Sequence, residues 1–228
     1  MRVAIFGHHK KEIEEEIKSL GFELVEENPE VVISYGGDGT LILSEFHFPS
    51  VPKLLLKSSK VCKLCEVFSN EEILQRFKNG KYTTKKLTKL EVSAHGKTLY
   101  AINDVIIHNE NPRHAIRYHV DISGERNPKH EIIGDGLIVS TKFCSTGYYK
   151  SITGSIFNVG IGLAFNNSTE QVSHMVINEE SMIKISITRG PVTVYADNQE
   201  DSFELKEGDE VVIKKSEKET EIVRVDLL

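Results

Sequence analysis

A glycine-rich turn with the sequence GGDGT, residues 36–40, is the segment best suited to chemistry. It follows the apolar run Val31–Tyr35 and precedes a helical pattern from about Thr40 to Phe46. Glycine lets a phosphate oxygen approach the backbone closely, and the first N–H groups of a helix point toward an anion. The candidate phosphate cradle therefore consists of Gly36, Gly37, Gly39 and Thr40.

Asp38 needs a separate role, because a carboxylate inside a phosphate cradle repels the phosphate. Such a carboxylate can hold a metal ion on a phosphate donor or take the proton from an attacking hydroxyl. We therefore predict that Asp38 is the catalytic residue. The alternative interpretation is a turn whose aspartate simply faces solvent.

The spacing of apolar residues along the chain changes near residue 86. Apolar runs alternate with helical patterns in residues 1–85, which predicts an α/β domain with a parallel sheet. The expected strands are 2–6, 22–25 and 31–35, and the expected helices 10–20, 40–46 and 71–78. Residues 86–228 show a period of two and predict a β-rich, sandwich-like domain. Its expected strands include 99–107, 116–123, 131–140, 181–188, 192–196, 201–205 and 210–214, and the charged stretch 214–221 is expected to form a solvated hairpin.

The composition of the 228 residues excludes several classes of protein. A net charge of −6 argues against binding nucleic acid through its phosphates. We expect a protein without membrane contact, because no apolar stretch approaches the roughly 18 residues that a spanning helix needs. Three cysteines are an odd number and do not suggest a disulfide framework, so we expect a reducing, cytoplasmic location. Cys62 and Cys65 form one C-x-x-C pair without the further ligands of a zinc site, and we expect two half-buried thiols.

Four later motifs narrow the interpretation of the glycine-rich turn. They are Asn103–His108 (NDVIIH), Gly134–Thr141 (GDGLIVST), Ser145–Tyr148 (STGY) and Ala196–Gln199 (ADNQ). The GGDGT turn alone resembles a superfamily that includes NAD kinases, diacylglycerol and sphingosine kinases and, more loosely, 6-phosphofructokinases. Together and in this order, the motifs resemble the NAD kinase family over almost the whole chain.

The resemblance implies a phosphotransferase of two domains. Such an enzyme transfers a phosphoryl group from ATP, or from inorganic polyphosphate, to the 2′-hydroxyl of the adenosine ribose of NAD and gives NADP. A divalent metal such as Mg²⁺ accompanies the donor, and no metal site made by the protein itself is expected. The resemblance also implies that the β-rich domain supplies most NAD contacts and that subunits pair into a homodimer or homotetramer.

The same resemblance assigns the residues that bind NAD. Asp104 would bind ribose hydroxyls with Asn103 beside it, and Asp135 would reach a ribose. Tyr148 could stack on a base. The remaining implied contacts are Asp38, Gly39, His114, Thr146, Gly147, Ser151 and, as a weaker transfer, Gln199. The alternatives are that Asn103 and Asp104 form an exposed turn, that Asp135 is a turn residue chosen for its backbone conformation, and that His114 is a surface residue.

Two segments depart from the family pattern. The usual loop Thr-Pro-Thr-Gly-Ser-Thr-Ala-Tyr becomes TKFCSTGY at 141–148, without the proline and the first glycine. The usual Asn-x-Gly-x-Leu-Gly-Phe-Leu becomes KSSKVCKL at 57–64, so the glycines are lost and lysines enter the segment. Two rival functions therefore stay open: a related lipid or sugar kinase, and an NAD-binding regulator with weak turnover. Asp38 favours an enzyme, and the lack of a basic amphipathic helix argues against a lipid substrate.

Overall fold

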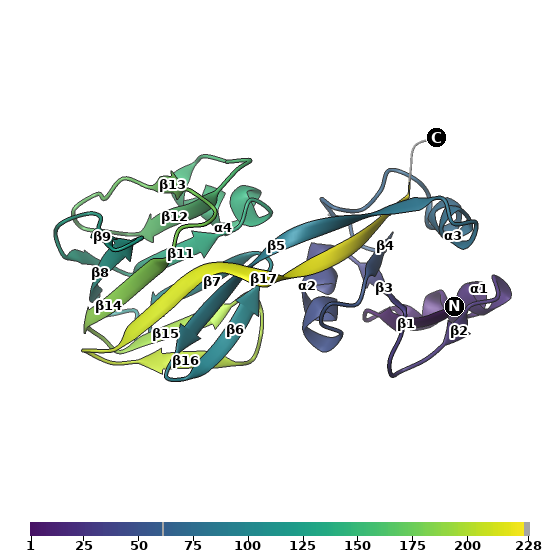
Figure 1. The fold of residues 1–228 in the computed structure, drawn as a ribbon, viewed down its shortest axis with the longest axis horizontal. Helices are drawn as coiled ribbons and strands as arrows, with labels where there is room; N and C mark the ends of the chain where they lie inside the picture. Colours follow the sequence, from purple (N-terminus) through teal and green to yellow (C-terminus); the bar gives the residue numbers. More distant parts are fainter. Residues whose placement is uncertain (61, 226–228) are drawn as a thin grey trace. The chain divides into compact units, whose positions relative to one another are not determined.

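The computed structural model describes residues 1–60 and 62–225, which form two units (Figure 1). The first unit contains Met1–Leu87 and the residues from Lys218 onward, and the second contains Thr88–Glu217. The boundary expected after residue 85 falls close to the observed one. Residues from 218 onward, expected in the second domain, belong to the first unit because the long strand β17 (Glu210–Val225) contributes to both.

The first unit contains a parallel sheet with the strand order β17-β4-β3-β1-β2. Its strands are β1 (Arg2–Phe6), β2 (Glu23–Leu24), β3 (Val31–Gly36), β4 (Lys53–Lys57) and the end of β17. Its helices are α1 (Glu14–Ser19), which follows a 3-10 turn at Lys10–Glu12, α2 (Asp38–His47) and α3 (Asn70–Lys78). The α/β fold expected for this half of the chain is therefore present.

The helices bury opposite faces of this sheet. Ile17 of α1 and Phe77 of α3 belong to one buried cluster with Ile33 of β3 and Leu54 of β4. Leu41 and its neighbour Ile42 of α2 are buried outside that cluster, where α2 contacts β3 and β4. Successive residues of a strand point to opposite faces, so a fully apolar strand such as β3 can be covered on both sides.

Two elements of the first unit differ from the sequence-based prediction. No strand was expected between residues 46 and 71, but Lys53–Lys57 forms β4, an inner strand of the sheet that lies beside β3. Helix α2 begins at Asp38 instead of Thr40, so the predicted catalytic residue lies in the first helical turn. There its negative charge lies at the positive end of the helix dipole.

A buried ion pair joins the end of α2 to the start of β4. Lys53 is fully buried, and its Nζ donates to a carboxylate oxygen of Glu45, which is 4% exposed. The same Nζ donates to the backbone oxygens of Phe48 (2.7 Å) and Val51 (2.5 Å), and the other Glu45 oxygen accepts the N–H of Ser50 (2.9 Å). The charges are thus surrounded by hydrogen-bond partners, as burial of an ion pair requires.

The second unit consists of two antiparallel sheets that enclose a shared core. One sheet contains β8 (Ile116–Ile122), β10 (Ile132–Gly134), β14 (Ile183–Arg189) and part of β17, joined by β5 (Tyr82–Ala94), β6 (Lys97–Ala101) and β9 (Glu125–Arg126). The other has the order β13-β12-β11-β7-β15-β16. Its strands are β7 (Asp104–Asn109), β11 (Gly136–Ser140), β12 (Ile161–Asn166), β13 (Met175–Ile177), β15 (Val192–Ala196) and β16 (Ser202–Leu205). Apolar residues of both sheets form one buried cluster, so the expected sandwich-like unit is present.

Three strand predictions for this half are wrong in detail. Residues 131–140 form two strands, β10 and β11, which lie in different sheets. Residues 99–107 likewise divide into β6 and β7. The stretch 214–221 is not a hairpin but part of β17, in which the small polar residues Ser216 and Thr220 are buried.

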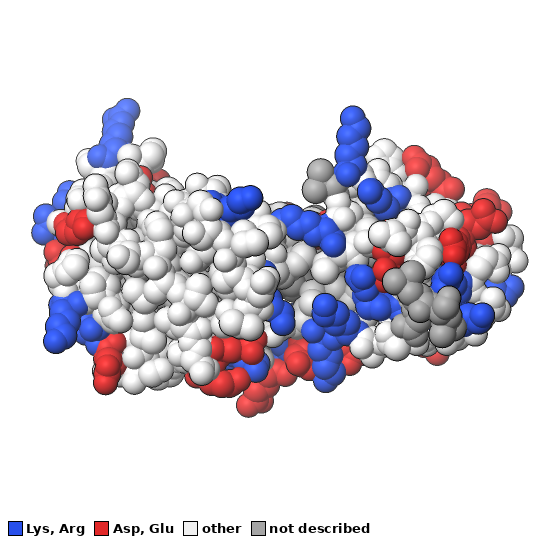
Figure 2. All heavy atoms as spheres, turned by 90° about the horizontal axis from the view of Figure 1, so that it is seen from above, with Lys and Arg blue, Asp and Glu red and all other residues white. Residues whose placement is uncertain are grey.

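The two units differ in the charge of their surfaces. On the face shown in Figure 2, Lys and Arg side chains are interspersed with Asp and Glu on the first unit, and much of the second unit is uncharged. No helix among the described residues has the length and apolar character needed to cross a membrane.

We predict that Lys53→Met lowers the free energy of unfolding by about 3–5 kcal/mol, because it leaves the Glu45 carboxylate buried without its cation. Urea denaturation measures the change, and the double variant Glu45→Gln/Lys53→Met should recover part of the loss. Lys86→Met is the control, since its partner Glu219 and Lys86 itself are exposed, and it should leave the urea midpoint unchanged. Equal effects of Lys53→Met and Lys86→Met would contradict a stabilising role for the buried pair.

Candidate functional site

The glycine-rich turn connects β3 directly to α2. Gly37 is extended (φ −130°, ψ −164°) and precedes the first helical residue, and its N–H donates to Thr40 Oγ1 (3.4 Å). A Cβ at Gly36 would lie 2.0 Å from the same Thr40 oxygen, so only glycine fits there. A Cβ at Gly39 would meet nothing within 4 Å, so the space beside that exposed residue is open.

A cavity of about 540 Å³ opens at this turn. All four cradle residues and Asp38 line it, together with His8, His9, Tyr35, Ser58 and Ser59. The first unit therefore brings the predicted phosphate cradle and the predicted catalytic carboxylate to one hollow. Backbone N–H groups at the start of α2 make this hollow suitable for an anion such as phosphate.

The Asp38 carboxylate is oriented by the backbone of a neighbouring loop. Its Oδ1 and Oδ2 both accept the N–H of Lys63 (3.0 Å each), and Oδ1 also accepts the N–H of Leu64 (3.3 Å). These donors lie in the segment that replaces the family's glycine-containing stretch. Because they are backbone groups, no side-chain motif in the sequence could identify them.

The loop that contacts Asp38 is itself held in place. Cys62 and Cys65 form a disulfide, so the expectation of two thiols is wrong. The two residues are near neighbours in a tight turn, where the N–H of Cys65 also contacts Cys62 Sγ (3.1 Å). Arg224 of β17 donates to the Leu64 oxygen (2.6 Å) and pairs with Glu66 (2.8 Å), which ties the loop to the C-terminal strand.

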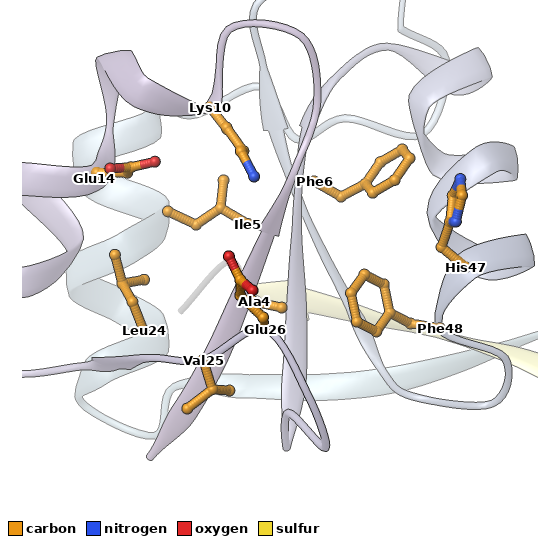
Figure 3. Close-up of a pocket in the computed structure, with 10 residues that line it drawn as sticks. All are labelled: Ala4, Ile5, Phe6, Lys10, Glu14, Leu24, Val25, Glu26, His47 and Phe48. Atoms are coloured by element: carbon orange, nitrogen blue, oxygen red, sulfur yellow. The ribbon is translucent and has the colours of Figure 1, made fainter.

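A second cavity of the first unit, of about 590 Å³, contains none of the predicted site residues. Figure 3 shows this cavity along β1. Phe6, His47 and Phe48 line one side of the cavity, and the charged residues Lys10, Glu14 and Glu26 line its other parts. The rings of Phe6 and His47 lie 5.0 Å apart. Cavity size alone therefore does not identify the site in this unit.

In the second unit, Asp104 is the first residue of β7. The carboxylate of Asp197 fixes the turn that precedes it. Asp197, 7% exposed, accepts the backbone N–H groups of Ile102 (2.7 Å), Asn103 (2.8 Å) and Asp104 (3.1 Å). Burial raises the pKa of Asp197 to about 7, although the three N–H donors act in the opposite direction. In the sequence, Asp197 stands out only as part of the ADNQ motif, and its position directly after the apolar run of β15 is the signal that indicates burial.

The Asp104 side chain is buried and bound by a thiol. It is 6% exposed, which makes the interpretation of Asn103 and Asp104 as a fully exposed turn wrong for Asp104. Cys144 Sγ donates to Asp104 Oδ2 (2.7 Å). Burial raises the pKa of Asp104, whereas the hydrogen bond from Cys144 lowers it. Burial and the nearby Asp104 raise the pKa of Cys144 to about 12, so the thiol keeps its proton at neutral pH.

The divergent loop 141–148 continues into a short helix beside Asp104. A 3-10 turn at Cys144–Thr146 leads through Gly147 to α4 (Tyr148–Thr153). Tyr149 is buried against Phe157, with ring centroids 4.8 Å apart, whereas Tyr148 is half-buried. Only Tyr148 of the two is thus open to a ligand. Thr146, Gly147 and Ser151 are exposed on the same segment.

Asp135 and His114 lie at the opposite end of β7 from Asp104. Asn109 Nδ2 connects them, since it donates to the His114 backbone oxygen (3.0 Å) and to Asp135 Oδ1 (3.4 Å). Asp135 Oδ2 accepts from Asn167 (2.9 Å). His114 is exposed, as its surface interpretation requires. The carboxylates of Asp104 and Asp135 both raise the pKa of Tyr148, after the larger effect of burial, so Tyr148 lies within the field of both.

Gln199 has a structural contact. Its Nε2 donates to the Tyr100 backbone oxygen (2.5 Å) and so joins the turn after β15 to β6. Gln199 is therefore tied to the backbone of the unit, while its neighbour Asp197 holds the turn on which Asp104 lies.

The chain thus has two units, an α/β unit with a glycine-rich turn suited to phosphate and a β-sandwich unit with polar residues at both ends of β7. Residues 102–225 match the family model of the ATP-NAD kinase C-terminal domain, which is more than half of the 228 residues. The chain belongs to the ATP-NAD kinase family.

Individual relatives support the same grouping. The chain is 30% identical over 213 residues to a bifunctional NADP phosphatase/NAD kinase of Methanococcus maripaludis, covering 86% of the chain and 36% of that relative. It is 28% identical over 227 residues to an NAD kinase of Natranaerobius thermophilus, covering 92% of the chain and 78% of that relative. The chain thus spans about a third of the first relative's length.

Two solved structures share the fold. An NAD kinase from Archaeoglobus fulgidus, solved in complex with ATP, superposes with a TM-score of 0.82 at 24% identity, covering 99% of this chain and 94% of that one. Yeast NADH kinase, solved with NADH, has a TM-score of 0.79 at 19% identity, covering 98% and 83%.

We predict that the Asp197 carboxyl titrates near pH 7 instead of near its ordinary value of 3.8, because it is buried. Carbon-13 NMR of the carboxyl groups, assigned with Asp197→Asn, measures the titration. Since the folded pKa is raised, the folded state retains a proton that the unfolded state loses between about pH 4 and 7. Wild type should therefore lose stability relative to Asp197→Asn as pH rises through this window. Titration near 3.8 would show that the N–H donors fully offset the effect of burial on the pKa.

Proposed function

We propose that the protein is an NAD kinase that transfers a phosphoryl group from ATP, or from polyphosphate, to the 2′-hydroxyl of the adenosine ribose of NAD. One observation carries the proposal: the cavity at the start of α2 combines a backbone phosphate cradle with the Asp38 carboxylate. A phosphate-binding site needs no carboxylate, whereas phosphoryl transfer to a hydroxyl needs a group that accepts its proton. Membership of the ATP-NAD kinase family supports the same reaction.

Each unit has its own part in the proposed reaction. In the first unit, the cradle would bind donor phosphates, and Asp38 would orient and deprotonate the acceptor hydroxyl. The contacts from Lys63 and Leu64 fix the direction of that carboxylate. In the second unit, Asp104 would bind ribose hydroxyls and Tyr148 would stack on a base. The other proposed contacts are Gly39, Asn103, His114, Asp135, Thr146, Gly147, Ser151 and Gln199.

The residues present fit a magnesium ion that arrives with the nucleotide. No three His, Cys, Asp or Glu side chains gather as metal ligands within residues 1–60 and 62–225. Magnesium usually keeps several waters and binds one or two carboxylates together with substrate phosphates, so Asp38 alone can suffice as the protein ligand. When bound, the ion would neutralise charge on the donor oxygens.

The rival functions make different demands on these residues. A lipid or sugar kinase would use the same cradle but would not need the acidic and aromatic groups of the second unit. An NAD-binding regulator would need the second unit but not Asp38. A cytoplasmic location is also part of the proposal and rests on the composition.

We expect Asp38→Asn to bind NAD normally while NADP formation from NAD, ATP and Mg²⁺ falls by about 10²–10⁴, the usual effect of losing a general base. Asn keeps the size of Asp and can still accept the N–H groups of Lys63 and Leu64, so the loop should stay in place. NAD affinity, NADP formation and melting temperature are measured on the same preparation.

Asp209→Asn is the matched control, because Asp209 is a turn aspartate that accepts the N–H of Lys206 (2.7 Å). It should leave turnover unchanged. Turnover of Asp38→Asn within about threefold of wild type would refute a catalytic role for Asp38. NAD binding by wild type without any NADP above a no-enzyme control would favour the regulator.

The proposal includes a homodimer or homotetramer that pairs through the β-rich unit. That unit exposes Ile156 (56%), Val159 (76%) and Val176 (44%) near the start of β12 and on β13. A Cβ at Gly160 would lie 3.1 Å from Val176 Cγ1, so Val159, the residue before Gly160, comes close to Val176. The uncharged face of the second unit in Figure 2 suits such pairing.

We predict that light scattering gives a dimer or tetramer and that Val159→Asp shifts it toward the monomer, because a charge would be buried on pairing. Val67→Asp is the control, since Val67 is 89% exposed in the first unit. A wild-type monomer at micromolar concentration with full activity would rule out the oligomer.

A further inference from the structure

The thiol of Cys144 lies between two groups that the proposed function assigns to NAD. It donates to Asp104 Oδ2 (2.7 Å), and the backbone N–H groups of Tyr148 and Tyr149 face its sulfur and lower its pKa. Cys144 is 5% exposed and is the residue that replaces the first glycine of the usual family loop. A glycine at this position would have no side chain to make either contact.

The two Asp104 oxygens consequently differ. Oδ2 accepts the thiol proton, while Oδ1 has no hydrogen-bond donor among the described residues and is not among the unpartnered polar atoms buried from solvent. The turn that carries Asp104 is fixed by Asp197, so rotation of the Asp104 side chain is the freedom that remains. A hydrogen bond to one oxygen removes that freedom and leaves the other oxygen open.

We propose that Cys144 is a positioning residue of the dinucleotide site, whose thiol holds Asp104 Oδ2 and so presents Oδ1 to a ribose hydroxyl. The proposal rests on the proposed function, in which Asp104 binds the ribose. Because the thiol already occupies Oδ2, the ribose hydroxyls that Asp104 is expected to bind would be accepted by Oδ1. Through the N–H groups of α4, the same sulfur fixes Asp104 relative to the backbone of Tyr148.

The thiol can act as such a donor throughout the neutral range. Its pKa of about 12 keeps the proton on sulfur, and no deprotonated thiolate competes with the carboxylate. Gly147 leaves the space that this arrangement needs, because a Cβ there would lie 3.3 Å from both the Cys144 oxygen and its sulfur. The STGY segment, which follows Cys144 in the chain, thus leaves room for the thiol in this position.

The test compares Cys144→Ser, which keeps a donor of similar size, with Cys144→Ala, which removes it. In Cys144→Ala we expect the KM for NAD to rise roughly three- to tenfold, as for loss of one hydrogen bond, with kcat and the KM for ATP within twofold. Cys144→Ser should restore the KM for NAD. Asp104→Ala is the reference for complete loss and should weaken NAD binding by about 10- to 150-fold.

An infrared measurement reads the hydrogen bond itself. Cys62 and Cys65 are joined, so Cys144 is the free thiol among the chain's three cysteines and the S–H stretching band belongs to it. Asp104→Ala should move this band to higher frequency, and NAD should shift it in wild type. An unmoved band, or equal KM values for NAD in Cys144→Ala and wild type, would overturn the positioning role.

The outcomes separate this inference from the function on which it rests. If wild type forms NADP and Asp104→Ala weakens NAD binding while Cys144→Ala does not, only the role of Cys144 fails. If wild type neither binds NAD nor forms NADP, the proposed function fails first. If Cys144→Ser and Cys144→Ala weaken NAD binding equally and lower the melting temperature equally, Cys144 is a packing residue and the inference is wrong.

Discussion

The Asp197 carboxylate binds three successive backbone N–H groups, and the proposed NAD-binding part of the second unit depends on this contact. The N–H groups belong to the turn between β6 and β7, where the chain passes from one sheet to the other. Such a crossing leaves donors without a strand partner, and buried donors without partners are costly. Asp197 satisfies them and thereby fixes the start of β7. Asp104, the thiol bound to it and the helix that follows that thiol then take their positions from this point.

The first unit uses the same kind of contact differently. Asp38 also accepts backbone N–H groups, but it is half-exposed and lines a cavity, whereas Asp197 is buried. Around Asp197 the chain surrounds the carboxylate, which is therefore a structural group. Asp38 is contacted by a loop and still lines the cavity at the glycine-rich turn. The similar bonding of two aspartates thus serves the fold in one unit, and in the proposed function it orients a reactive carboxylate in the other.

The sequence predicted the elements whose signal is local. The apolar run before GGDGT and the helical pattern after it are found as β3 and α2, because burial on both sides of a sheet and on one side of a helix requires these patterns. Strand β4 was missed because Pro49 and Pro52 suggested a loop, although the apolar residues after them form an inner strand paired with β3. The charged part of β17 was misread because its buried positions are Ser216 and Thr220, which carry no apolar signal.

The site could be predicted only as far as side chains define it. Asp38, Asp104 and Tyr148 stand in recognisable motifs, but the groups that orient them are backbone N–H groups and a cysteine in a divergent loop. Backbone donors have no sequence signature, since every residue except proline carries one. The chain therefore reveals which groups could react, while their orientation depends on long-range contacts that no local pattern encodes.

The glycines of the GGDGT turn differ in whether the fold itself requires them. Gly36 is required by the protein itself, since any side chain there would overlap Thr40, whereas Gly39 borders open space and no protein contact explains it. Gly136, like Gly36, is required by the fold. It lies where the chain passes from one sheet to the other, and at its φ of +156° a Cβ would lie 1.9 Å from the Ile107 oxygen. In the proposed function, Gly39 would keep the space beside the carboxylate clear for a ligand. Gly39 is thus a residue of the turn at which the fold itself sets no requirement for glycine.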